Sequence, residues 1–189
     1  MQLFEAIEKR HSVRAFRSDT VPREALEKIM RAAALAPSAL NEQPWLFYVT
    51  SGETRRRVGE IMAQSTTHLE EYVDLIGPER MSEAVRWYSE LGNAPVVIVC
   101  AMPKADDPFG RLNKQISVGA AIQNVLLAAT AIGLAACNIT FAFWVRDELA
   151  SHLGVPKDHE IVTIIALGYS AEHEPVSPPH KSDIAEYLD

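Results

Sequence analysis

The sequence contains little cysteine and no long hydrophobic run. Its 189 residues include two cysteines, Cys100 and Cys137, and neither belongs to a CxxC motif. This excludes a disulfide framework, so we expect two buried, reduced thiols in a cytoplasmic protein. The longest apolar stretch, residues 120–136, is interrupted by polar residues and falls short of the roughly 20 residues that span a membrane. The N-terminus also lacks the order of charged and apolar residues that is typical of a signal peptide.

A surplus of positive charge and the common catalytic motifs are also missing. The net charge is −7, which argues against nucleic acid or anionic membranes as partners. There is no GxGxxG motif, P-loop, GxSxG elbow or histidine pair with metal-ligand spacing. We therefore expect no metal site, and a nucleotide-like cofactor would need another means of phosphate binding. The length and the 48% hydrophobic content favour a single domain over residues 1–189.

The hydrophobic pattern predicts one sheet with long helices between its strands. Short apolar or β-branched runs predict strands at 45–50, 95–101, 134–139 and 161–167. Helical spacing predicts helices at 3–9, 22–36, from about 53, within 69–76 and 81–91, at 116–132 and at 145–153. The helix at 116–132 is apolar nearly all round, which is typical of a buried helix. These elements indicate an α+β or α/β layered fold.

Three stretches have little regular pattern. Residues 65–93 and 103–113 are long and irregular, and we expect them to form lids over a site. Residues 170–189 are rich in proline and acidic residues and predict an extended C-terminal arm.

The first candidate site is the segment Arg10-His11-Ser12-Val13-Arg14, which lies in a locally basic part of an acidic chain. In an extended segment, Arg10, Ser12 and Arg14 would project to the same side. Two guanidinium groups and a hydroxyl on one side suit a phosphate, because arginine donates paired hydrogen bonds to phosphate oxygens. The alternative interpretation is a solvated charged surface, and the pattern of these residues taken alone favours that interpretation.

The second candidate site is a loop over residues 36–45, fixed by Pro37 and Pro44. Ser38, Asn41 and Gln43 bring donors and acceptors to this loop, which would suit the edge of a heteroaromatic ring. An ordinary helix-to-strand turn that uses these side chains as caps explains the pattern equally well.

Several sequence blocks occur in a specific order over nearly the whole chain. They are RHSVRAF, APSALNEQPW, APVVIV, SVGAAIQNVLLAATAIGLAAC and ALGY, followed by a basic residue in the tail. Each block alone is weak evidence, but the ordered series resembles the FMN-dependent nitroreductase family. The resemblance implies an α+β fold with a central, mainly antiparallel sheet flanked by helices. It also implies an intertwined homodimer with FMN bound at the subunit interface.

The resemblance further implies a cofactor-binding set drawn from four parts of the chain. These are Arg10, His11, Ser12 and Arg14; Pro37, Ser38, Asn41 and Gln43; Ile139, Thr140 and Phe141; and Lys181. In the family, the first group binds the phosphate and the pyrimidine side of the ring, and the second reaches the flavin from the partner subunit. The third lies at flavin N5, where Thr140 is the candidate catalytic residue. Lys181 stands where the family has a basic residue for the phosphate.

The activity implied by the resemblance is oxidation of NAD(P)H and reduction of nitroaromatic, quinone or other flat, electron-poor acceptors in a ping-pong order. The aromatic residues that could line the substrate site are Trp87, Tyr88, Phe141, Phe143 and Trp144. Packing in the core or between subunits is the alternative role for each of them.

Two departures from the family pattern keep alternatives open. Ser117 stands where many relatives have an acidic residue, and Thr140-Phe141 replaces the Glu-Gly or Gly-Ala of other branches. A hydroxyl at this position resembles the dehalogenase-like branch, in which hydrogen bonding to N5 favours one-electron chemistry. A flavin-binding protein without turnover is the other alternative.

Overall fold

The computed structural model describes residues 1–72, 74, 77–172 and 179–188. Four strands form one antiparallel sheet in the order β1-β2-β4-β3, as the resemblance implied. Their bounds are β1 Leu46–Ser51, β2 Val96–Pro103, β3 Ala135–Ile139 and β4 His159–Gly168. All of β2 except Pro103 is buried, because this strand lies inside the sheet and both of its faces are covered.

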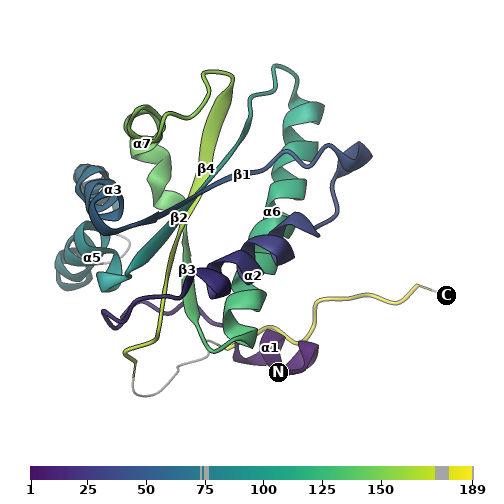
Figure 1. The fold of residues 1–189 in the computed structure, drawn as a ribbon, viewed down its shortest axis with the longest axis horizontal. Helices are drawn as coiled ribbons and strands as arrows, with labels where there is room; N and C mark the ends of the chain where they lie inside the picture. The colour runs from purple at the N-terminus through teal and green to yellow at the C-terminus, as the bar shows by residue number, and fades with distance from the viewer. Residues whose placement is uncertain (73, 75–76, 173–178, 189) are drawn as a thin grey trace.

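Helices cover both faces of the sheet (Figure 1). One face carries α2 (Arg23–Ala34) and α6 (Pro108–Ala131), whose buried side chains share a core cluster with Ile98 and Ile165. The other face carries α3 (Gly52–Gln64), α5 (Pro78–Glu90) and α7 (Arg146–Leu153). Val97 and Ile164 belong to the core cluster on this second face. Strand alternation therefore divides the apolar side chains between two layers, which gives an α+β fold.

Shorter elements complete the chain. Helix α1 spans Leu3–Lys9, as predicted, and α7 ends at Leu153, followed by Gly154 as a left-handed cap. Short 3₁₀ helices cover Ala39–Asn41, Ser65–Tyr72, Leu91–Asn93 and Thr140–Val145. Both cysteines are buried free thiols, which confirms that prediction, and burial raises the pKa of Cys100 to about 12. Within the described part of the chain, no helix is long and apolar enough to cross a membrane.

Two helices begin at residues that differ from the prediction. Helix α6 begins at Pro108, so half of the stretch predicted as an irregular segment at 103–113 is helical. The cause is local: the Asp107 side chain accepts a hydrogen bond from the Gly110 amide at 2.7 Å, and Pro108 favours the first helical position. Pro22 caps α2 and does not belong to its first turn.

The described residues of 65–93 are mostly helical, and α5 confirms the helix predicted within 81–91, although it begins earlier, at Pro78. Part of the helix predicted at 69–76 lies outside the described residues. A lid role for 65–93 or 103–113 stays a prediction.

The apolar composition of α6 predicted a helix buried on all sides, but one face of α6 is exposed in the single chain. Phe109 is 72% exposed and Ile116 is 64% exposed in this single chain, and Leu112 is also exposed. Leu3, Phe4 and Ile7 of α1, which packs beside α6, are exposed as well. The chain therefore presents an apolar surface on α1 and α6.

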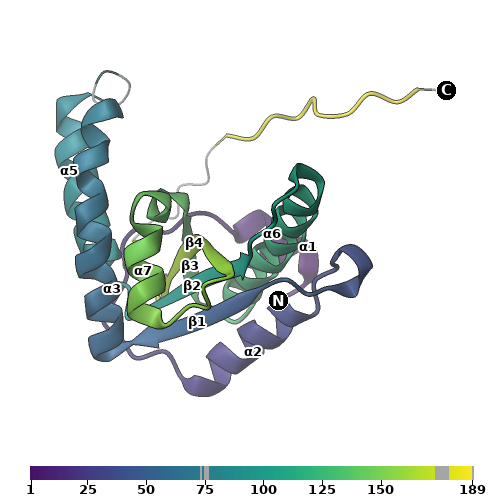
Figure 2. The same cartoon turned by 90° about the horizontal axis from the view of Figure 1, so that it is seen from above.

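The C-terminal arm is extended where the structure describes it. Residues 179–188 form no helix or strand and run away from the body of the fold (Figures 1 and 2). Tyr187 is 91% exposed, so this segment contacts little of its own chain.

Candidate functional site

The segment that follows α1 runs beside strand β3. Ser12 forms a parallel bridge with Ala136, and the Val13 amide donates to the Ala136 carbonyl at 3.2 Å. Val13 is buried, whereas Ser12 and Arg14 are exposed. The segment is therefore extended, and its exposed polar side chains alternate with a buried one as the sequence predicted.

Arg14 lies at an open pocket of about 410 Å³ whose lining includes Trp87 and Tyr88 of α5. The Arg14 Nη1 atom donates to the Ser12 carbonyl at 3.3 Å. Tyr88 stacks on Phe141, with ring centroids 4.6 Å apart and an interplanar angle of 30°. Burial raises the pKa of Tyr88, so its phenol stays neutral near pH 7. A guanidinium group thus lies beside a stacked aromatic pair.

The predicted N5-binding residues follow directly from β3. Ile139 is the last residue of the strand and is buried, whereas Thr140 begins the next 3₁₀ turn and is exposed. Phe141 is half-buried against Tyr88. Strand β3 also pairs with the segment at Ser12. The structure therefore brings two of the four predicted groups, those at 10–14 and 139–141, to the same strand.

His11 lies on a different side of this segment from Arg14. Its Nδ1 atom is 2.9 Å from the Lys9 carbonyl oxygen, and its Nε2 atom is 3.5 Å from Glu172 Oε2. Nε2 is buried and has no hydrogen-bond partner among the described residues. His11 lines a smaller pocket of about 240 Å³ together with Glu172, whereas Arg14 lines the pocket under α5.

The loop with Ser38, Asn41 and Gln43 lies well apart from segment 10–16 in the single chain (Figures 1 and 2). Ser38 Oγ accepts a hydrogen bond from the Gln43 amide at 3.0 Å, and Gln43 Nε2 donates to Asn41 Oδ1 at 3.3 Å. Ser117 Oγ of α6 accepts from the Ala39 amide at 3.2 Å. These side chains hold the loop against α6, which gives Ser117 a structural role.

Two further predicted residues also lie away from Arg14. Pro37 is exposed at the start of the loop, and Lys181 is exposed in the C-terminal arm. One chain therefore assembles only part of the predicted cofactor-binding set.

The aromatic candidates divide into two groups. Trp87 and Tyr88 lie at the Arg14 pocket, and the Trp87 indole donates to the Arg14 carbonyl at 2.7 Å. Phe143 contacts the Arg146 guanidinium, 4.4 Å from its ring centroid, while Trp144 stacks on His68 at 4.1 Å. No local sequence pattern predicts the contact of Trp87 with the main chain, because the two partners are far apart in the sequence.

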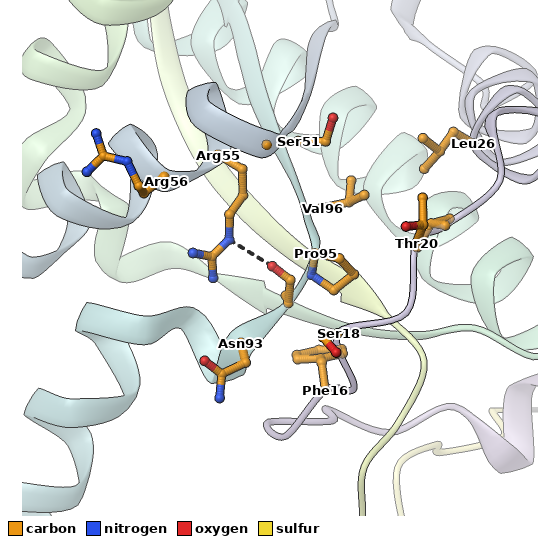
Figure 3. Close-up of a pocket in the computed structure, with 13 residues that line it drawn as sticks. Phe16, Ser18, Thr20, Leu26, Ser51, Arg55, Arg56, Asn93, Pro95 and Val96 are labelled. Atoms are coloured by element: carbon orange, nitrogen blue, oxygen red, sulfur yellow. Dashed lines mark hydrogen bonds between the residues drawn. The ribbon is translucent and has the colours of Figure 1, made fainter.

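A larger pocket lies elsewhere, between the N-termini of α2 and α3 (Figure 3). Its volume is about 770 Å³, and none of the predicted cofactor-binding residues lines it. Arg55 donates to the Ala94 carbonyl at 2.7 Å, and Arg56 pairs with Glu53 and Glu60. Both arginines therefore have partners in the chain. Among the described residues, no cluster of three potential ligands could hold a metal ion.

The sequence model of the nitroreductase family matches residues 7–169. The chain belongs to the nitroreductase family. The match covers the segment beside β3, the whole sheet and the residues that follow β3. This confirms the resemblance seen in the ordered sequence blocks.

Curated relatives span most of the chain. A protein of Archaeoglobus fulgidus, provisionally named NADH dehydrogenase/NAD(P)H nitroreductase, is 32% identical over 171 residues, covering 87% of this chain and 83% of the relative. Nitroreductase NfnB of Mycolicibacterium smegmatis is 30% identical, with 87% and 81% covered. Iodotyrosine deiodinase 1 of Mus musculus is 27% identical over 89% of this chain and 62% of its own length.

Solved structures share the fold. A nitroreductase of Bacteroides fragilis with bound FMN has a TM-score of 0.75 and is 25% identical, and each chain is fully covered. A BluB-like flavoprotein of Clostridium difficile is also 25% identical, has a TM-score of 0.82 and is fully covered.

Proposed function

We propose that this protein is an FMN-dependent oxidoreductase that uses NAD(P)H to reduce nitroaromatic, quinone or related flat, electron-poor acceptors. The observation that carries the proposal is the open pocket at which Arg14 lies beside the Tyr88–Phe141 stack, next to the end of β3. Family membership supports it, as do the relatives named for NAD(P)H nitroreduction and the similar structure with bound FMN.

The residues at this pocket fit the chemistry of FMN. The cofactor carries a phosphate of about −2 charge near neutral pH and a flat ring that accepts hydrogen bonds along its edge. Arg14 and Ser12 offer an exposed cation and an exposed hydroxyl, and the aromatic pair offers an apolar surface. The Nε2 atom of His11 does not add to this set, because His11 lies on the other side of the segment and lines the pocket that contains Glu172.

When bound, FMN supplies the redox chemistry by accepting two electrons from NAD(P)H and passing them to the acceptor. The chain's own residues bind the cofactor and orient its ring. We infer that Arg10, Ser12 and Arg14 counter the negative charge of the phosphate and of the ring edge. We also infer that Thr140 holds N5 through its hydroxyl or its backbone amide. No acid–base pair is required, and a ping-pong order follows if reductant and acceptor use the same pocket in turn.

The rest of the predicted set leads us to propose a homodimer. Pro37, Ser38, Asn41, Gln43 and Lys181 lie away from Arg14 in one chain, so they would have to come from the partner subunit. The exposed apolar surface on α1 and α6 supports this, because large apolar patches on single chains mark interaction sites. Leu40, at the tip of the same loop, is 95% exposed, and burial between subunits would account for it.

The experiment for the activity is oxidation of NADH and of NADPH by FMN-loaded protein, with a nitroaromatic and a quinone as acceptors. We expect turnover that depends on FMN, with parallel double-reciprocal lines that indicate a ping-pong order. Protein that retains FMN but oxidises neither nucleotide with either acceptor would overturn the proposal and favour a flavin-binding protein without turnover.

The cofactor site has its own test. Arg10→Ala and Arg14→Ala should each weaken FMN binding by about 1.5–3 kcal/mol, which is the value of a hydrogen bond to a charged group. Arg23→Ala is the matched control, since Arg23 is exposed on α2 and pairs only with Glu27 among the described residues. Unchanged affinity in both site variants would remove these arginines from the site.

One observation favours a second function. Thr140 places an exposed hydroxyl where the dehalogenase-like branch has one, and iodotyrosine deiodinase is among the relatives. A reductive titration in the presence of an iodinated phenol distinguishes the two functions. Electron uptake in two separate one-electron stages with iodide release supports the dehalogenase-like function, whereas a single two-electron stage without iodide release supports nitroreduction.

A further inference from the structure

The main chain of Arg14 is held by side chains that are remote in the sequence. Its amide donates to Glu172 Oε1 at 2.7 Å, and its carbonyl accepts from Trp87 Nε1 at 2.7 Å. The neighbouring amides differ, since those of Val13 and Phe16 donate to main-chain carbonyls of Ala136 and Gly92. Two side chains thus bind both main-chain polar groups of this one residue.

Gly92 packs directly against the same carbonyl. A Cβ atom at this position would lie 2.1 Å from the Arg14 oxygen and 3.0 Å from Trp87 Nε1. Its φ of +60° also favours glycine, and its carbonyl accepts the Phe16 amide at 2.9 Å. The turn after α5 can therefore approach Arg14 only because residue 92 has no side chain.

Glu172 is itself held in place. The Ala171 amide donates to the Ala15 carbonyl at 2.9 Å, and the Glu172 amide donates to Ser170 Oγ at 3.1 Å. The second carboxylate oxygen of Glu172 faces His11 Nε2 at 3.5 Å. The carboxylate thus joins two residues of the predicted cofactor-binding segment from the side opposite the Arg14 pocket.

We propose that Trp87, Gly92 and Glu172, which we name the Arg14 clamp, position the Arg14 guanidinium for the cofactor. Trp87 and Glu172 are positioning residues in this proposal, which rests on the proposed function. Fixing the peptide at Arg14 restricts the directions in which its side chain can point, so less conformational entropy is lost when an anion binds. The clamp also links Arg14 to α5, so displacement of that helix would move the cation.

The decisive experiment is a double-mutant cycle between Trp87→Phe and Arg14→Ala, with the FMN dissociation constant measured by flavin fluorescence. Phe keeps an aromatic ring but removes the indole N–H, and the substitution leaves the net charge unchanged. We expect Trp87→Phe to weaken binding about fivefold when Arg14 is present, because one hydrogen bond is lost. When residue 14 is alanine, the same change should have less than about a twofold effect.

Equal weakening in both backgrounds would overturn the proposal, because it would mean that Trp87 supports the fold generally and does not act through Arg14. Absence of weakening in the Arg14 background would overturn it as well. Trp45→Phe is the matched control: Trp45 packs against the other face of the sheet, and its effect should be the same in both backgrounds.

A measurement without FMN separates the clamp from the proposed function. In the free protein, residue-resolved hydrogen exchange at the Arg14 amide should be at least about fivefold faster in Glu172→Ala than in the native chain, with partial recovery in Glu172→Gln. The Val13 amide, which donates to Ala136, is the internal control. Unchanged Arg14 exchange in Glu172→Ala would refute the clamp, whereas native protein that binds no FMN would refute the proposed function and still leave the exchange result valid.

Discussion

Gly92→Ala should lower the free energy of unfolding more than a glycine-to-alanine change at a turn of similar φ where the new Cβ meets no neighbour. The new Cβ would lie 2.1 Å from the Arg14 oxygen, and neither the main chain of Arg14 nor Gly92 can shift without loosening the Phe16–Gly92 hydrogen bond. A left-handed conformation costs a non-glycine residue about 1–2 kcal/mol, and overpacking typically adds about 1–3 kcal/mol. We therefore expect the free energy of unfolding to fall by about 2–5 kcal/mol, a large part of a typical domain's stability.

Gly52→Ala is the matched control for this prediction. Gly52 has a similar φ of +54°, but nothing lies within 4 Å of its would-be Cβ. The free energy of unfolding of Gly52→Ala should therefore fall by only about 1–2 kcal/mol, the cost of the left-handed conformation alone. Urea unfolding of both variants, followed by circular dichroism, gives the comparison. If the two losses agree within about 0.5 kcal/mol, the close approach of Gly92 to Arg14 does not exist in solution.

Three further predictions concern the subunit interface, the buried thiol and the N5 position. Ile116→Glu should convert a dimer to a folded monomer in size-exclusion chromatography with light scattering, because Ile116 is 64% exposed in the single chain; a dimeric variant would contradict the proposed interface. Burial raises the pKa of Cys100 to about 12, above that of an unfolded thiol, so the contribution of this thiol to stability should be constant below about pH 8.5 and decline towards pH 12 as the unfolded chain releases the proton. Cys100→Ala should show a shallower decline in thermal melts over this range, and an identical decline would refute the assignment. Thr140→Ala should slow acceptor reduction about fivefold while Thr140→Ser retains the native rate, and equal rates in the two variants would exclude a role for the hydroxyl.

Local signals explain why most of the secondary structure could be predicted. The apolar run at 95–101 became the buried strand β2, and Gly154 ended α7, because each pattern acts within a few residues of chain. The start of α6 was also encoded in Asp107-Pro108, a capping residue followed by proline, but the polar composition of that stretch favoured a loop. The exposed face of α6 was not predictable, since an apolar helix looks the same whether its own chain or another covers it.

The candidate site was predictable only in part, for a related reason. Alternation in 10–14 predicted that Ser12 and Arg14 share one side of the segment, but it could not place His11 against Glu172. Glu172, Trp87 and Gly92 reach Arg14 through contacts between distant parts of the sequence, and no local pattern marks them. In the proposed dimer, Ser38 and Lys181 reach Arg14 from the partner subunit, and no pattern within one chain can show such a contact.

The visible absorbance spectrum of the purified protein shows whether this chain binds FMN. We expect the absorbance bands of an oxidised flavin and release of FMN on denaturation, or the appearance of these bands after reconstitution with FMN. A colourless protein that does not take up added FMN would refute FMN binding.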